Sequence, residues 1–224
     1  MRKKAGRSCA GKKRNARVRV KICGVNSAAA FDAAADAGAD YIGFVFFNRS
    51  PRGISPGTAA GLSSRLAGGP HRIGLFVDPS DDDIARALDA LPLHALQLYV
   101  TADRLTAIHA SFAVPVWQAV GMDTRADLPS QTGAAAALVV EARPPAGADR
   151  PGGLGRTLDW TMLQGWNPDI PWLLAGGLTP DTVQRAVAAS GASGVDVSSG
   201  VESAPGIKDA ALIHAFVTAA RASG

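Results

Sequence analysis

A lysine and a cysteine stand two residues apart in the first apolar run of the chain, Lys21-Ile-Cys23-Gly24. Alternate residues of a strand point to the same face, so we expect both side chains to lie together. A thiolate can act as a nucleophile or a general base when its pKa is lowered, and a neighbouring ammonium favours that charged form. Cys23 could equally be an inert buried cysteine, which is a common state for a free thiol.

A carboxyl and a guanidinium stand near the ends of two further apolar runs. Glu141 ends the Ala- and Val-rich run 137–141, where apolar surroundings would raise its pKa and let it act as a general acid. The alternative is a surface carboxylate paired with Arg143. Arg52, in Ser50-Pro-Arg52, could hold a substrate carboxylate with two parallel hydrogen bonds, or it could be an ordinary solvated loop arginine.

Two loops of small residues could bind an anion. Gly176-Gly177 lies between an apolar run and a helical pattern that begins at Pro180, and Ser198-Ser199-Gly200 follows the next apolar run. Backbone N–H groups and hydroxyls in such loops can bind phosphate. The alternative is that these residues only form tight turns.

The elements that position these residues alternate between short apolar runs and helical patterns. The predicted strands cover residues 18–23, 41–46, 72–77, 95–98, 114–119, 137–141, 171–174 and 194–197. The predicted helical connectors cover 27–37, 56–66, a segment starting at 79–83, 102–110, 124–131, 159–164, 180–190 and 208–221. Eight such units in one domain predict a (β/α)8 TIM barrel, with a doubly wound open sheet as the alternative.

In a TIM barrel the active site lies at the C-terminal ends of the strands. This rule adds Lys21, Gln97, Tyr99 and Asp196 to the candidate site residues. The Pro- and Gly-rich loop over 143–155 is long for a barrel, which favours a functional role. No histidine pair has metal-ligand spacing, so we expect no metal site.

The composition excludes several classes of protein. Of 224 residues, 47% are apolar and 19% are charged, which is typical of a globular domain. Aromatic residues make up only 6%, which argues against an aromatic platform for nucleic acid. No apolar run reaches the roughly 18 residues of a membrane helix. Two cysteines are too few for a disulfide framework, so we expect a reduced, cytoplasmic protein.

The net charge of +4 comes from the N-terminal segment. Residues 1–17 carry eight basic side chains and no acidic one, which leaves 15 basic against 19 acidic residues in the rest. We expect residues 1–16 to be a disordered basic extension and residues 17–224 to form one catalytic domain. A basic tail can contact nucleic acid or a membrane. A solvated extension is the favoured interpretation here, so neither partner is expected.

Several segments between residue 18 and the C-terminus form an ordered set. They are Val18-Arg-Val-Lys-Ile-Cys-Gly24, Gly38-Ala-Asp-Tyr-Ile-Gly-Phe-Val-Phe-Phe47, Ser50-Pro-Arg52, Ile54-Ser-Pro56, Gly74-Leu-Phe-Val77, Leu96-Gln-Leu98, Gly152-Gly-Leu-Gly-Arg-Thr-Leu-Asp-Trp160, Leu174-Ala-Gly-Gly-Leu-Thr-Pro180, Val195-Asp-Val-Ser-Ser-Gly-Val-Glu202, Pro205-Gly206 and Lys208-Asp209. Together they resemble the phosphoribosylanthranilate isomerase family of tryptophan biosynthesis. Each segment alone is a weak signal, whereas the ordered set is specific and covers nearly the whole domain.

The resemblance implies an Amadori rearrangement of N-(5'-phosphoribosyl)anthranilate to 1-(2-carboxyphenylamino)-1-deoxyribulose 5-phosphate, with no cofactor. It implies that Cys23 is the general base, that Glu141 occupies the position of the general acid, and that Arg52 holds the anthranilate carboxylate. The phosphate would bind at Gly155, Gly176, Gly177, Ser198, Ser199 and Gly200. The expected partner is therefore a phosphorylated small molecule, and the protein is expected to be a monomer or a homodimer.

Three positions depart from the pattern of this family. Tyr99 stands where the fourth strand usually ends in histidine, Gln118 where a lysine is common, and Glu141 where the acid is an aspartate. Glutamate moves the carboxyl by roughly 1.5 Å, and a shift of that size affects rate. Asp149 is a less favoured substitute acid. Two alternatives stay open: an isomerase acting on another phosphoribosyl amine, and a non-catalytic protein that binds a phosphorylated ligand.

Overall fold

A computed structural model of the chain describes residues 17–148, 150–153 and 155–223. The predicted basic extension, residues 1–16, lies outside the described residues, and so does Asp149, the less favoured candidate acid. The described residues thus fall within the predicted catalytic domain, residues 17–224.

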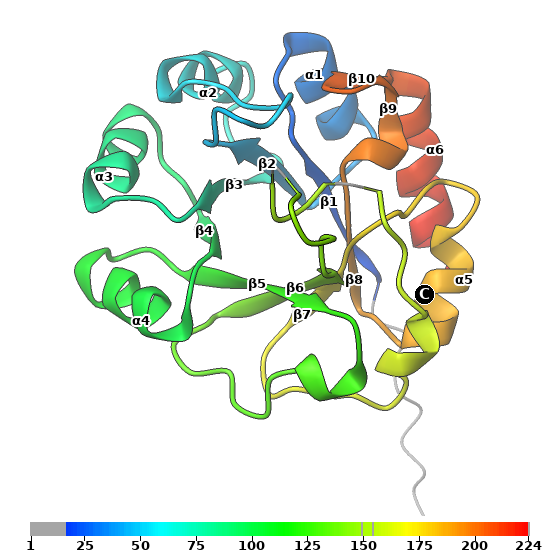
Figure 1. Cartoon of the computed structure of the whole chain (residues 1–224). Coiled ribbons are helices and arrows are strands. Elements are labelled where there is room, and N and C mark those ends of the chain that lie inside the picture. Colours follow the sequence, from blue (N-terminus) through cyan, green and yellow to red (C-terminus); the bar gives the residue numbers. More distant parts are fainter. Residues whose placement is uncertain (1–16, 149, 154, 224) are drawn as a thin grey trace, which may run out of the picture.

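Eight parallel strands close into a barrel whose order around the sheet follows the order along the chain (Figure 1). The strands are β1 (Arg19–Cys23), β2 (Tyr41–Val45), β3 (His71–Val77), β4 (Ala95–Tyr99), β5 (Val116–Met122), β6 (Ala137–Ala142), β7 (Trp172–Leu174) and β8 (Gly194–Val197). β1 completes the ring, because Lys21 lies opposite Tyr41 on one side and Asp196 on the other. This closure confirms the predicted TIM barrel and excludes the open sheet.

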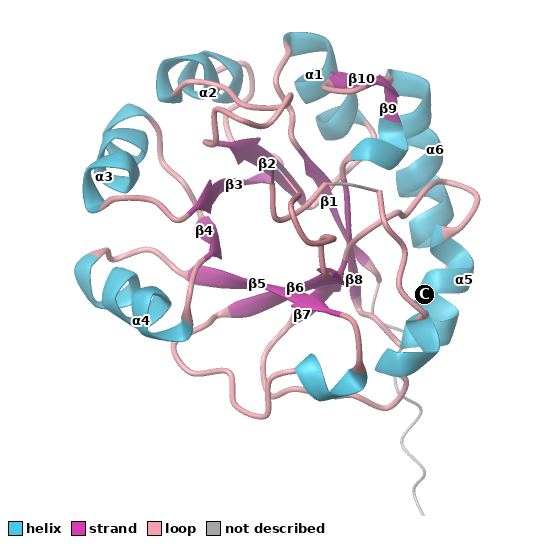
Figure 2. Ribbon diagram, viewed as in Figure 1, coloured by secondary structure: helices cyan, strands magenta, loops and turns pink. Residues whose placement is uncertain are grey.

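Helices cover the outside of the barrel (Figure 2). They are α1 (Ala28–Asp36), α2 (Pro56–Ser63), α3 (Asp81–Ala90), α4 (Ala102–Ser111), α5 (Val183–Ser190) and α6 (Ala210–Arg221). The Ser27 side chain accepts a hydrogen bond from the Ala30 N–H at the start of α1, and Ser80 forms a capping box with Asp83 at the start of α3. These side chains satisfy N–H groups that have no partner within the helix. Both helix starts were predicted on this basis.

Two predicted helices are only short 3-10 turns. The helix expected over 124–131 is reduced to η1 (Arg125–Asp127), because Pro129 cannot donate a backbone hydrogen bond and Gly133 adopts a left-handed backbone. The helix expected over 159–164 is η2 (Trp160–Leu163), which Gly165 follows with a φ of 72°. The outer ring is therefore thinner beside β5, β6 and β7.

A short hairpin that the sequence pattern did not predict follows β8. A 3-10 turn, η3 (Ser199–Val201), leads into β9 (Glu202–Ala204) and β10 (Ile207–Lys208). Gly206 turns the chain with a φ of 81°, and a side chain there would overlap the carbonyl of Pro51. Strands this short show no alternation of apolar and polar residues, so no pattern indicates them.

The barrel interior is filled by two layers of side chains. The first cluster contains Tyr41, Ile73, Ala95, Trp117, Ala137, Val139, Leu173 and Ala175. A smaller cluster nearer the C-terminal ends of the strands contains Cys23, Val45 and Leu75. A third and larger cluster lies between the strands and the helices. The cleft described below lies above the filled interior, at the C-terminal ends of the strands.

Candidate active site

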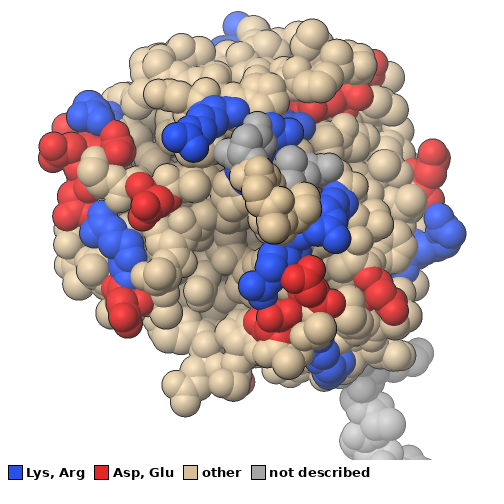
Figure 3. Space-filling model, in the orientation of Figure 1, with Lys and Arg blue, Asp and Glu red and all other residues tan. Residues whose placement is uncertain are grey.

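A cleft lies at the C-terminal ends of the strands, beside the loop that follows β6. Most of the predicted site residues line it, namely Cys23, Arg52, Tyr99, Glu141, Gly155, Gly176, Gly177, Asp196, Ser198 and Ser199. Lys and Arg side chains lie around the centre of this face, where the loops meet (Figure 3). The closed barrel thus brings together residues from both ends of the domain.

Three predicted site residues lie behind the wall of the cleft. Lys21 and Gln97 are buried in the barrel interior, with 0% and 1% of their surface exposed. Within the described residues, Oε1 of Gln97 is buried without a hydrogen-bond donor. Gly200 packs against the backbone of Leu178, where no Cβ would fit. Packing therefore accounts for the glycine at position 200.

Lys21 forms a buried ion pair with Asp196 across the seam between β1 and β8. Its Nζ lies 3.0 Å from Oδ1 and 3.1 Å from Oδ2 of Asp196. Gly43 makes room for the ammonium, since a Cβ at that position would lie 3.1 Å from Nζ. Burial acts to lower the pKa of Lys21, but Asp196 and Cys23 outweigh this effect and raise it. Lys21 is therefore a charged group under the cleft.

Cys23 is a buried free thiol that lines the cleft. Burial raises the pKa of Cys23, and the negative charge of Asp196 adds to that rise. The Lys21 ammonium, which is hydrogen-bonded to the sulfur, acts in the opposite direction. The ammonium expected from the sequence is thus in place, although burial has the larger effect. The positive charge of Lys21 would therefore stabilise the thiolate that forms when Cys23 loses its proton.

Glu141 is buried at the end of β6, where it accepts a hydrogen bond from the Tyr99 hydroxyl. Oη lies 2.5 Å from Oε1. Burial raises the pKa of Glu141 from 4.5 to about 7, while the hydrogen bond from Tyr99 opposes that rise. About half of the carboxyl groups therefore carry a proton near neutral pH, so a proton is available for general acid catalysis. Arg143 instead pairs with Asp123 and Asp127, so the alternative of a surface pair with Glu141 is wrong.

The loop after β6 covers the Glu141 carboxyl with backbone, and in Figure 1 it crosses the mouth of the barrel. A Cβ at Gly152 would lie 2.6 Å from Oε1 of Glu141 and would also overlap the Tyr99 hydroxyl. The backbone N–H of Gly153 donates to the Glu141 carboxyl. The carbonyl of Gly153 accepts from Nη1 of Arg52 at 3.3 Å. The glycines therefore allow a close approach that other residues would block.

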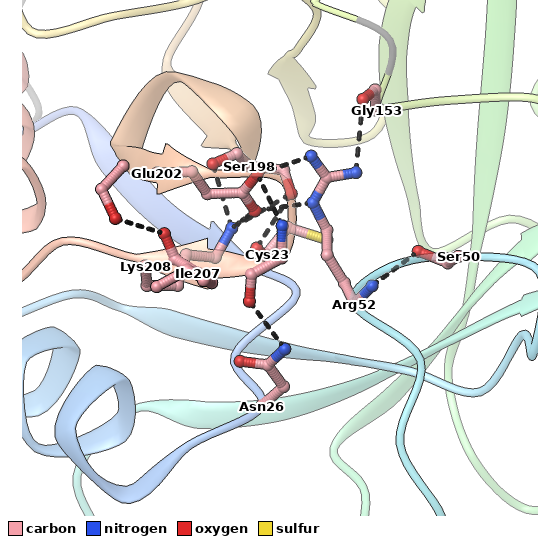
Figure 4. Close-up of polar contacts among 11 residues, drawn as sticks. Cys23, Asn26, Ser50, Arg52, Gly153, Ser198, Glu202, Ile207 and Lys208 are labelled. Carbon is pink, nitrogen blue, oxygen red and sulfur yellow. Dashed lines mark hydrogen bonds and ion pairs between the residues drawn. The ribbon is translucent and has the colours of Figure 1, made fainter.

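Arg52 is held by the carboxylate of Glu202, at the start of β9 (Figure 4). Nε and Nη2 of Arg52 donate to Oε1 and Oε2 of Glu202 at 2.7 and 2.8 Å, and Nζ of Lys208 donates to Oε1 at 2.8 Å. Burial acts to raise the pKa of Glu202, but Arg52 and Lys208 lower it to about 2. Arg52 is only 4% exposed, so it is not a solvated loop arginine.

Glu202 and Lys208 are site residues that the sequence reasoning missed. Both stand in segments quoted for the family resemblance, but no role was assigned to them. Nothing in their spacing from Arg52 indicates a contact, because Glu202 lies 150 residues further along the chain. The contact depends on the β9–β10 hairpin, which the sequence pattern does not reveal.

One end of the cleft is lined by backbone from small residues. Gly155, Gly176 and Gly177 all have positive φ angles, of 69°, 85° and 64°. The Ser198 hydroxyl donates to the carbonyl of Cys23 at 3.1 Å and accepts from Nζ of Lys208 at 3.2 Å. The hydrogen of this hydroxyl is thus already used, so backbone N–H groups are the donors left for a ligand at Ser198.

Gln118 does not belong to the cleft. Gln118 stands two residues from Val116 and from Val120 along β5, so its side chain points to the same face as theirs. Both valines pack in the core between strands and helices, so this is the outer face of the barrel. Across the described ranges, no group of three or more His, Cys, Asp or Glu residues is arranged to hold a metal ion. In the same part of the chain, no helix is long and apolar enough to cross a membrane.

The closed barrel and its cleft define the class: a TIM-barrel enzyme whose acid and base candidates lie at the C-terminal ends of the strands. The chain belongs to the N-(5'-phosphoribosyl)anthranilate isomerase family, whose sequence model matches residues 20–219. The N-(5'-phosphoribosyl)anthranilate isomerase of Acidiphilium cryptum is 49% identical over 92% of this chain and 99% of its own length.

Solved structures of the same family have the same fold. The protein from Jonesia denitrificans superimposes with a TM-score of 0.79 at 34% identity, over 92% of this chain and 98% of its own. A phosphoribosyl anthranilate isomerase in complex with reduced 1-(o-carboxyphenylamino)-1-deoxyribulose 5-phosphate has a TM-score of 0.76 at 29% identity. That match covers 92% of this chain and 99% of the other.

Proposed function

We propose that this chain isomerises N-(5'-phosphoribosyl)anthranilate to 1-(2-carboxyphenylamino)-1-deoxyribulose 5-phosphate in tryptophan biosynthesis. Membership of the family and the ligand held by a solved relative support this reaction. The observation that carries the proposal is that a buried carboxyl, Glu141, and a buried thiol, Cys23, line one cleft. An Amadori rearrangement needs one group that donates a proton and one that removes a proton.

In the first step, Glu141 donates its proton to the ring oxygen of the ribose. The bond between the first sugar carbon and the ring oxygen breaks, and its electron pair stays on that oxygen. The lone pair of the anthranilate nitrogen then forms a double bond to the first carbon, which yields an iminium ion. The pKa of about 7 for Glu141 supports this role, because the carboxyl carries a transferable proton at neutral pH.

In the second step, the Cys23 thiolate removes the proton from the second sugar carbon. The freed electron pair forms a double bond to the first carbon and neutralises the iminium nitrogen. The resulting enaminol becomes the ketone by proton transfer alone. The Lys21 ammonium, hydrogen-bonded to the sulfur, stabilises the thiolate that acts here. The steps only relocate protons and electron pairs within the substrate, so no redox cofactor takes part.

Arg52 binds the anthranilate carboxylate in this proposal. A guanidinium has five N–H groups. Glu202 accepts from two of them and Gly153 from a third. One N–H group of Nη1 and one of Nη2 are then left to donate to the substrate carboxylate. The ion pair with Glu202 fixes the plane of the guanidinium, and so the direction of these two N–H groups. The phosphate binds on backbone of Gly155, Gly176, Gly177, Ser198 and Ser199, which line the same cleft, with Gly200 supporting the turn.

The cellular context is part of the same proposal. The free thiol of Cys23 is needed in reduced form, which suits the cytoplasm. A monomer or a homodimer is consistent with a cleft built from one chain. Complementation of a tryptophan auxotroph that lacks this isomerase tests the function. Growth without tryptophan is the expected result. No growth from a well-expressed protein would favour another phosphoribosyl amine as substrate, or a binding role.

A further inference from the structure

We propose that Tyr99 is a positioning residue for Glu141: its hydroxyl holds Oε1, so that the proton to be donated sits on Oε2. This inference rests on the proposed function, in which Glu141 is the general acid. It adds a residue from a third strand, β4, to a reaction otherwise assigned to β1 and β6. Tyr99 acts on the substrate only through Glu141.

The contact between the two side chains is short and buried. Oη of Tyr99 lies 2.5 Å from Oε1 of Glu141, and Glu141 is only 6% exposed. Burial and the charge of Glu141 raise the pKa of Tyr99 well above its ordinary value of 10, so the phenol keeps its hydrogen and is the donor. At 2.5 Å the contact lies at the short end of the range for O–H···O hydrogen bonds in proteins.

The barrel geometry makes this contact possible. β5 lies between β4 and β6, so the Tyr99 side chain must cross it to reach Glu141. The residue of β5 that lies opposite Glu141 is Gly121, and the preceding residue on the same face of β5 is Ala119. No large side chain of β5 therefore separates the phenol from the carboxyl. An aspartate at 141 would be shorter by about 1.5 Å and would end beyond hydrogen-bond distance.

Tyr99 and Glu141, the two partners of this hydrogen bond, both depart from the pattern of the family. By the resemblance given above, Tyr99 stands at a position where the family pattern has histidine, and Glu141 at a position where it has aspartate. A longer acid displaces the carboxyl, and the phenol supplies a donor at the displaced position. We therefore read the two departures as one coupled change.

The hydrogen bond also determines which oxygen carries the proton. A carboxylic acid holds its proton on one oxygen and accepts more readily on the other. Because Oε1 accepts from Tyr99, the proton is directed to Oε2, whose orientation toward the substrate is then fixed. Asp196 and Lys21 act on the charge of Glu141, Cys23 acts on that of Tyr99, and Arg150 lines the same cleft. They come from β8, β1 and the covering loop, and none of them is altered in the test below.

The first test is the pH profile of Tyr99→Phe, which keeps the ring and removes the donor. The kcat is expected to fall by about tenfold with little change in KM. The hydrogen bond favours the ionised carboxyl, so its loss raises the pKa of Glu141. The alkaline limb of kcat/KM is therefore expected to move upward by on the order of one pH unit. A purely structural role would lower activity at every pH without moving this limb.

Tyr41→Phe is the matched control, since Tyr41 is a buried tyrosine of the inner-barrel cluster whose hydroxyl bonds to Arg19 at 2.8 Å. It should leave the kcat and the pH profile unchanged. A second control is the Glu141→Asp background, where the carboxyl no longer reaches the phenol. There, Tyr99→Phe should change kcat by less than about twofold, because the two positions no longer interact.

The results separate this inference from the proposed function. If Glu141→Gln is inactive but Tyr99→Phe keeps the parental kcat and alkaline limb, the role of Tyr99 is wrong and the acid assignment stands. If the native protein does not isomerise the substrate, a carbon-13 NMR titration of the Glu141 carboxyl still tests whether the Tyr99 hydroxyl controls the pKa of Glu141. An upward shift of the Glu141 pKa in Tyr99→Phe supports the hydrogen-bonding role, and an unchanged pKa contradicts it.

Discussion

At the scale of single residues, the candidate acid Glu141 and the guanidinium of Arg52 are each held by one buried neighbour, Tyr99 and Glu202 respectively. Cys23, Glu141 and Arg52 were chosen because each stands at or just after the end of an apolar run, and all three line the cleft. Their partners were harder to predict. Tyr99 was chosen for its position, but its contact with Glu141 depends on the small residues of β5, which no local pattern relates to β4.

Glu202 allows a test at the same scale. Its pKa of about 2 in the folded protein lies below the ordinary 4.5, so its contribution to stability is complete above pH 4.5 and is lost as the pH falls toward 2. Glu202→Gln should lower the free energy of unfolding at pH 7 by about 3 kcal/mol, because Arg52 and Lys208 lose a buried partner.

Urea unfolding of the native protein and Glu202→Gln at pH 7 and pH 3 checks this expectation. The difference between the two proteins should be smaller at pH 3 than at pH 7. Asp32→Asn, which removes the exposed pair with Arg65, is the control and should have little effect at either pH. An equal loss at both pH values would show that Glu202 acts through packing and not through its charge.

At the scale of elements, strands were predicted better than their connections. Strands buried on both faces are continuous apolar runs, which are easy to recognise. The connector over 124–131 was predicted as a helix from weak evidence, and Pro129 stops it after one turn. The β9–β10 hairpin was missed because its strands are too short to show a period. That hairpin nevertheless holds Arg52 through Glu202.

A substitution in the loop after β6 tests whether the backbone of this loop must lie close to Glu141. Gly152→Ala places a Cβ within about 2.6 Å of Oε1 of Glu141 and against the Tyr99 hydroxyl, so either the loop or the carboxyl must move. The kcat should fall on the order of 10²-fold, as for a shift of about 1 Å in a catalytic group.

Gly61→Ala in α2 serves as the control, since Gly61 has a helical backbone and a Cβ there meets no other atom within 4 Å. It should keep the parental kcat. If Gly152→Ala also kept the parental kcat, the loop would not need its close approach to Glu141 during the reaction.

At the scale of the whole molecule, the barrel accounts for the fold without the N-terminal segment. The ring closes through β1 and β8, both within the described residues. Residues 1–16 show no apolar periodicity in the sequence, so they can bury little surface. Deleting them should leave the melting temperature and kcat unchanged. A fall in melting temperature of several degrees would show that the segment contributes to the stability of the barrel.

In the proposed reaction, Glu141 and Cys23 are the acid and the base of one isomerisation. The most direct measurement is product formation by the native protein, Glu141→Gln and Cys23→Ser, with N-(5'-phosphoribosyl)anthranilate as substrate. We expect turnover by the native protein, a fall in kcat of at least about 10²-fold in each variant, and little change in the affinity for a phosphorylated product analogue. A variant that keeps most of the native kcat would contradict the role of the residue it removes.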